Sequence, residues 1–178
     1  KDYLEKEAQR AIKAYEQAPT APGKIMGAAK ALMKLEDEAY ENQAVDILAK
    51  AHRDTGAYQF TLQIGDIKIR QLTRRFRQLR DSGDKTAAAE QLSKILEFEL
   101  QEFTERSENY PTDLVIKFEL GRRQLQAGKY DEAIGSFQQA QRDPKRHHIA
   151  LNYLGQTFAK KGWFREAADT YKKALDAD

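Results

Sequence analysis

Apolar residues recur every three or four positions along most of the chain, the spacing that places them on one face of an α-helix. The first such run covers residues 2–18 and ends at a segment rich in Pro and Gly, residues 19–23, as helices commonly do. Further runs cover residues 24–37 and 40–54, and Gly56 follows the last of them. The pattern predicts three amphipathic helices in the N-terminal third.

The last third of the chain repeats itself with a 34-residue period. A unit of this length, made of two helices, cannot bury its apolar face alone, so such units stack into a solenoid. The period therefore predicts a helical array whose concave side is free to hold another molecule. The pairs that recur are Leu120 and Leu154, Gly121 and Gly155, Gly128 and Gly162, Tyr130 and Phe164, Glu132 and Glu166, Ala133 and Ala167, Phe137 and Tyr171, and Ala140 and Ala174.

A small residue, a large one four positions later and a small one three positions after that occur in both the first and the last third. On a helix this spacing places two small side chains beside a bulky one, so a neighbouring helix can pack closely. The four sets are Ala11, Tyr15 and Ala18; Ala44, Leu48 and Ala51; Ala133, Phe137 and Ala140; and Ala167, Tyr171 and Ala174.

With these motifs, residues 114–178 resemble two tetratricopeptide repeats, and residues 2–55 resemble the same family more weakly. The resemblance implies an all-α fold, a right-handed superhelical solenoid of antiparallel helix pairs. One departure is Lys117, which stands where the family usually has a large apolar residue, so we expect looser packing at that edge.

We expect three parts along the chain. Residues 1–57 would hold one and a half degenerate repeats, residues 58–110 an elongated helical hairpin, and residues 111–178 the two units 114–147 and 148–178.

The elongated hairpin is inferred from a break in the period. Gly65 would be the counterpart of Gly121 in the preceding unit, but the step between them is clearly longer than one period. Shared between two antiparallel helices, the excess adds about three turns to each, at about 3.67 residues per turn. Residues 58–83 contain six basic and two acidic residues, and residues 84–110 contain seven acidic and three basic residues. The opposite charges favour the pairing of these two arms, by about 0.3 to 0.5 kcal/mol for each exposed pair.

An alternative for the start of this segment is a β-hairpin. Residues 58–69 alternate between apolar and polar positions around Gly65 and Asp66, which is typical of two short strands. A lone hairpin in a helical array would leave exposed edges, however, and a helical stripe also runs through the segment. We therefore expect a helix. The stripe comprises Phe60, Ile64, Ile67, Leu72, Phe76 and Leu79.

Composition narrows the classes of function. The chain has 30 basic and 28 acidic residues, a balance that by itself does not indicate nucleic acid or a membrane surface as partner. No apolar run approaches the roughly 18 residues of a membrane span. The chain begins at Lys1, so we expect a fragment that lacks its true N-terminus, with cytoplasm as the default compartment.

No arrangement of residues predicts catalysis, a metal site or a cofactor. The chain has no cysteine, and its histidines are His52 at an expected helix end and the adjacent pair His147 and His148. Neighbouring histidines point about 100 degrees apart on a helix, and no carboxylate completes a metal-binding pair. We expect a protein that is not an enzyme and that binds no metal.

The resemblance assigns the concave groove to the first helix of each repeat. The positions it implies are Val115, Phe118, Arg122 and Leu125 in one repeat and Ile149, Asn152, Gln156 and Lys160 in the next. Apolar and polar groups mix along this face, as on a surface that holds a peptide or protein segment. The family's clamp for chaperone tails is not reproduced, because Phe118 and Asn152 stand where lysine is needed.

We therefore expect a protein-interaction scaffold with a peptide groove. An alternative is an assembly module that forms a homo-oligomer through the long hairpin or the last helix, which has no outer cover. A nucleic-acid adaptor ranks third, because no aromatic residues for base stacking interleave with the arginines of residues 58–83.

Overall fold

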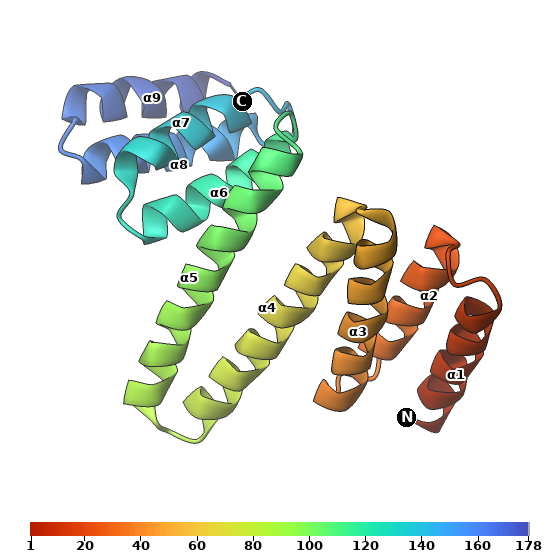
Figure 1. Ribbon diagram of the computed structural model, residues 1–178. Helices are drawn as coiled ribbons and strands as arrows, with labels where there is room; N and C mark the ends of the chain where they lie inside the picture. The colour runs from red at the N-terminus through yellow and green to blue at the C-terminus, as the bar shows by residue number, and fades with distance from the viewer. Residues whose placement is uncertain (178) are drawn as a thin grey trace. The chain divides into compact units, whose positions relative to one another are not determined.

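The computed structural model describes residues 1–177, which are helical apart from the turns between helices (Figure 1). This described part contains no β-strand, which confirms the predicted all-α fold. The helices are α1 (Asp2–Gln17), α2 (Pro22–Met33), α3 (Glu38–Thr55), α4 (Tyr58–Asp81), α5 (Lys85–Asn109), α6 (Leu114–Gln126), α7 (Tyr130–Ala140), α8 (His147–Lys160) and α9 (Phe164–Asp176).

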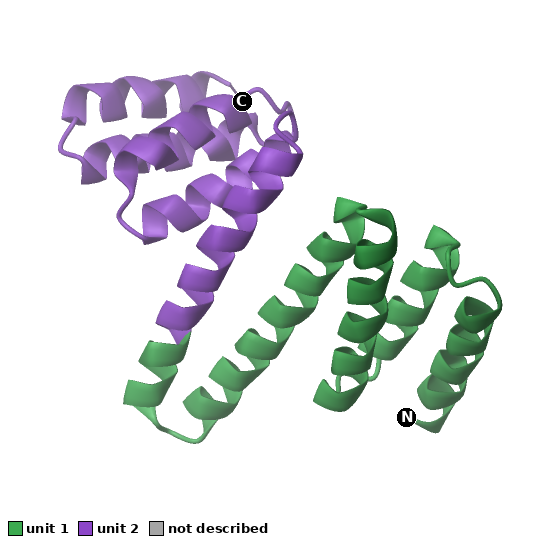
Figure 2. Cartoon of the chain, in the orientation of Figure 1, with its two compact units in different colours: residues 1–91 green, residues 92–178 purple. Residues whose placement is uncertain are grey.

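The chain divides into two compact units, residues 1–91 and residues 92–178 (Figure 2). The division falls within α5. The segment for which a β-hairpin was the alternative is part of the continuous helix α4, so the helical interpretation of that stretch was right. The three-part division of the chain and the elongated hairpin over residues 58–110 stay predictions.

In the first unit each helix packs on the next one along the chain, α1 on α2, α2 on α3 and α3 on α4. Small residues make this close packing possible, because Ala28, Ala29 and Ala44 have almost no exposed surface. Asp37 caps α3, since its carboxylate accepts hydrogen bonds from the backbone N–H groups of Ala39 and Tyr40. The larger side chains of the core are Ile25, Leu32, Leu48, Phe60 and Ile67.

An ion pair joins α3 to α4 at the edge of this core. The Glu41 carboxylate is 1% exposed and accepts two hydrogen bonds from the Arg74 guanidinium, with N–O distances of 2.9 and 2.5 Å. The hydrogen bonds from Arg74 lower the pKa of Glu41, against the opposing effect of burial. Both oxygens of a buried charge are thus satisfied by one bidentate partner.

This pair predicts a pH dependence of stability. A carboxyl whose pKa is lower in the folded chain contributes stability above its unfolded pKa of about 4.3 and loses it as the pH falls through the folded value. Glu41→Gln should therefore be less stable than the unmodified chain at pH 7, and the difference should shrink below about pH 4. Urea unfolding followed by circular dichroism across this range tests it, and a difference independent of pH would contradict it.

In the second unit α6 packs on α7, α7 on α8 and α8 on α9. The core alternates aromatic and aliphatic side chains with alanines that have little or no exposed surface. Its members are Phe118, Ala133, Phe137, Ala140, Ala150, Leu151, Leu154, Phe158, Ala167 and Ala174.

The part of α5 in this unit is tied to α6 by polar contacts. Arg123 donates to Glu99 at 2.6 Å, and its guanidinium lies 4.6 Å from the centre of the Phe103 ring. Lys117 donates to the hydroxyl of Ser107 at 2.6 Å. Lys117, the residue that departs from the family pattern, therefore links α6 to α5.

Two of the repeated glycines, Gly121 and Gly155, lie under aromatic rings of the following helix. A Cβ atom on Gly121 would come within 2.8 Å of the Phe137 ring, and one on Gly155 within 2.6 Å of the Tyr171 ring. Real Cβ atoms do not approach other atoms so closely, so glycine lets the two helices of each pair pack against each other. Gly121 and Gly155 thus act in packing.

Candidate functional site

The predicted groove residues lie on α6 and α8, the first helices of the two C-terminal pairs. Asp113 fixes the start of α6, because its carboxylate accepts hydrogen bonds from the N–H groups of Val115 and Ile116 at 3.0 and 3.1 Å. Near the starts of the two helices, Val115 and Ile149 are 41% and 44% exposed. Two apolar side chains at equivalent positions of the two repeats therefore lie at the surface.

The polar groove residues follow further along the same helices. Gln156 and Lys160 are exposed, and Asn152 is half-buried. The guanidinium of Arg122 lies 5.7 Å from the centre of the Tyr153 ring. These groups offer amides and two cations to a molecule lying over the helices.

Arg122 also has an acidic neighbour on its own helix, since its guanidinium is 3.6 Å from the Glu119 carboxylate. Its side chain nevertheless stays 38% exposed. The ring beneath it and the carboxylate beside it hold the cation at the surface, where it can still meet a second carboxylate.

Phe118 is not on the surface, contrary to the expectation that it supplies an apolar anchor. It is 5% exposed, and its ring packs edge-on against Phe137 and Tyr153, with centroids 6.1 and 5.6 Å away. Leu125 is half-buried against the same core. The α8 side chain of Tyr153 covers Phe118, which places the phenylalanine in the core.

Tyr153 is the residue that sequence reasoning missed. It stacks on Phe137 with centroids 5.5 Å apart and carries Arg122 on its ring, so it links the core to the polar face. Its counterpart one period earlier is Glu119, so the repeat pattern gave no reason to single it out. An aromatic residue between the polar Asn152 and the core Leu154 was the one available signal.

The histidines make backbone contacts. The Nδ1 atoms of His52, His147 and His148 lie 3.2, 2.8 and 2.9 Å from the carbonyl oxygens of Ala57, Gln141 and Ala174. Among residues 1–177 no three acidic or histidine side chains are grouped as a metal site would require. Every helix of the same range is too short or too polar to cross a bilayer.

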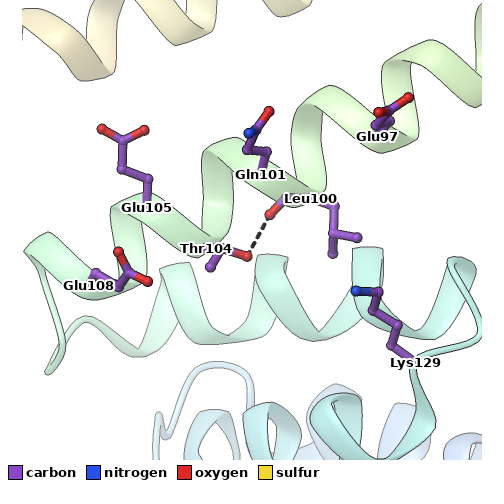
Figure 3. A pocket seen from close by; sticks show the side chains of 7 residues that line it. All are labelled: Glu97, Leu100, Gln101, Thr104, Glu105, Glu108 and Lys129. Carbon is purple, nitrogen blue, oxygen red and sulfur yellow. Dashed lines mark hydrogen bonds between the residues drawn. The ribbon is translucent and has the colours of Figure 1, made fainter.

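A surface depression of about 530 Å³ lies along α5 in the second unit (Figure 3). Leu100 points toward the neighbouring helix and Lys129 toward Leu100, while Gln101 and Glu105 point away from that helix. The hydroxyl of Thr104 donates a hydrogen bond to the Leu100 carbonyl oxygen at 2.6 Å, so this donor already has a partner within α5. The remaining lining residues are Glu97 and Glu108, so the depression is acidic with one cation at its rim.

Comparison with known proteins points to one family. Residues 118–178 match the model of the tetratricopeptide repeat family. No curated protein matches the chain.

Solved structures give the same fold. The crystal structure of YrrB, a TPR protein with an unusual peptide-binding site, is 21% identical, with a TM-score of 0.58 over 99% of this chain and 79% of that one. The crystal structure of MamA is 18% identical, with a TM-score of 0.55 over 99% of this chain and 83% of that one. At sequence identities this low, the comparison shows a shared fold and nothing more.

Proposed function

Because the chain is a tetratricopeptide repeat protein, with the family's repeats matched over residues 118–178, we propose that it is a non-enzymatic protein-interaction scaffold. Its binding surface is formed by α6 and α8 and holds a peptide or protein segment. The fold it shares with YrrB, a repeat protein described as having a peptide-binding site, supports this class of function.

The observation that carries the proposal is the pair Val115 and Ile149. Both are apolar and well exposed, and they occupy equivalent positions on α6 and α8, which contact each other. A segment lying across the two helices would meet one apolar side chain on each. Exposed apolar residues at matching positions of neighbouring helices are typical of an interaction surface.

The polar residues of the same helices complete the surface. Arg122, held over Tyr153, and the exposed Lys160 would attract a carboxylate, while Asn152 and Gln156 would bond to the backbone of the bound segment. The surface therefore fits a segment with apolar side chains followed by an acidic residue.

Replacing Val115 and Ile149 together by Gln should weaken peptide binding at least tenfold while leaving helicity unchanged, because both side chains are already exposed. The probes are 12-residue peptides selected against the unmodified chain from a random phage-displayed library, with affinity measured by fluorescence anisotropy. Phe118 is unsuitable for this test, since its loss would damage the core.

The control is Leu92→Gln, which changes an apolar side chain of similar exposure on α5. Selected peptides should bind this variant as they bind the unmodified chain. Peptides that bind the double variant equally well, or a selection that yields no specific peptide, would refute the proposed surface.

A further inference from the structure

The outer face of α9 carries an apolar stripe. Phe164, Ala168, Tyr171 and Leu175 follow at spacings of four, three and four, which places them on one face of the helix. Phe164 is 72% exposed, Tyr171 36% and Leu175 71%. Large apolar side chains exposed in one row on a helix are unusual for a surface that meets only water.

The same face of α7 is covered. The counterparts one period earlier are Tyr130, Ile134, Phe137 and Gln141, of which Phe137 has no exposed surface and the other three are half-buried. Helix α8 packs on α7 there, and its Tyr153 stacks on Phe137 with centroids 5.5 Å apart. The stripe on α9 is thus exposed at the positions where α8 covers α7, and no described residue covers it.

A charged residue at the edge of this face differs between α7 and α9. Asp131, near the start of α7, forms an ion pair with Lys161, the residue that directly follows α8. The counterpart of Asp131 on α9 is Arg165, so the sign of the charge is reversed. Arg165 and its neighbour one heptad later, Lys172, are exposed and form no ion pair with residues 1–177.

We propose that α9 binds an amphipathic helix of a partner protein that carries an acidic residue near its C-terminal end. Its apolar side chains, at three- and four-residue spacing, would cover Phe164, Tyr171 and Leu175. Its acidic residue would pair with Arg165, as Lys161 pairs with Asp131. A second α8 helix in this position would bring Lys161 to Arg165, so the charges select against a copy of this chain.

This surface is separate from the α6 and α8 face proposed above, and either proposal can fail alone. The probe is a fluorescein-labelled copy of residues 146–162, held helical by a hydrocarbon staple that replaces Gln156 and Lys160, both exposed in the chain. It is made in two forms, with Lys161 and with Lys161→Glu. Binding to the full chain is measured by fluorescence anisotropy.

The Glu form should bind the unmodified chain about threefold or more tightly than the Lys form, because one like-charged contact becomes an opposite-charged one. Arg165→Asp should reverse this order, since it recreates the Asp131 and Lys161 pair. Equal affinities of the two forms for both chains would overturn the assigned charge selection.

The apolar stripe is tested separately. Phe164→Gln together with Leu175→Gln should weaken binding of the Glu form at least tenfold, and Tyr3→Gln, which changes an aromatic residue of similar exposure on α1, should not. Unchanged binding to the double variant, or no binding to the unmodified chain, would overturn the proposal. So would a dimer in sedimentation equilibrium that Leu175→Gln abolishes, because a second copy would then occupy the face.

Discussion

Arg74→Met is expected to lower the free energy of unfolding of residues 1–91 by about 3 kcal/mol, because it leaves the buried Glu41 carboxylate without its partner. Removing one member of a buried ion pair costs more than the pair contributes, since the remaining charge has lost both water and counter-charge. Urea unfolding of the full chain, with amide hydrogen exchange of α3 reporting on this unit, measures the loss.

The matched control is Arg75→Met, which removes an exposed arginine from the next position of α4. It should change stability by less than about 0.5 kcal/mol, as surface substitutions usually do. Combining Arg74→Met with Glu41→Leu should recover most of the loss, because an apolar pair can replace a buried ion pair at little cost. Similar losses for the two arginine variants would mean that the Glu41 pair is unimportant for stability.

Gly121→Ala should destabilise the second unit by about 1 to 3 kcal/mol, the usual cost of overpacking a core. The new methyl group would meet the Phe137 ring, which has no exposed surface and is stacked on Tyr153, so the ring cannot move away. The higher helix propensity of alanine, worth up to about 1 kcal/mol, offsets only part of this cost.

Gly155→Ala is the matched comparison, one period later in the chain. Its methyl group would approach Tyr171 even more closely, but that ring is 36% exposed on the uncovered face of α9 and can rotate aside. We expect a clearly smaller loss, measured by thermal or urea unfolding of both variants in parallel. A larger loss for Gly155→Ala than for Gly121→Ala would show that Tyr171 is held as firmly as Phe137.

The sequence predicted the helices well because their physical causes are local. The turn before Gly56 and the stripe through residues 58–81 are set by neighbours three or four positions away. The alternating residues 58–69 satisfied a strand pattern as well, and the longer helical stripe correctly decided between the two. Gly121 and Gly155 recur one period apart, and in the structure both make the same close contact with an aromatic ring.

The burial of two residues could not be predicted, because it depends on contacts with residues far away in the sequence. Phe118 occupies a position that the family resemblance places on the concave face, but Tyr153 from α8 covers it. Glu41 falls in register with the inward-facing Ala44 and Leu48 of α3, and only the approach of Arg74 from α4 explains a buried charge there. Neither partner could be chosen from spacing alone, because each lies on a different helix.

The reversed charge at Arg165 bears on how such an array can evolve. Repeat proteins gain length by tandem duplication of a unit, and a copy of α8 and α9 added after α9 would bring its own lysine, the copy of Lys161, to Arg165. The added unit would therefore bring two positive charges together where it packs on α9, a small unfavourable contribution that a single substitution could remove. Arg165 thus slightly disfavours a copied unit at this end relative to a helix that carries an acidic residue there.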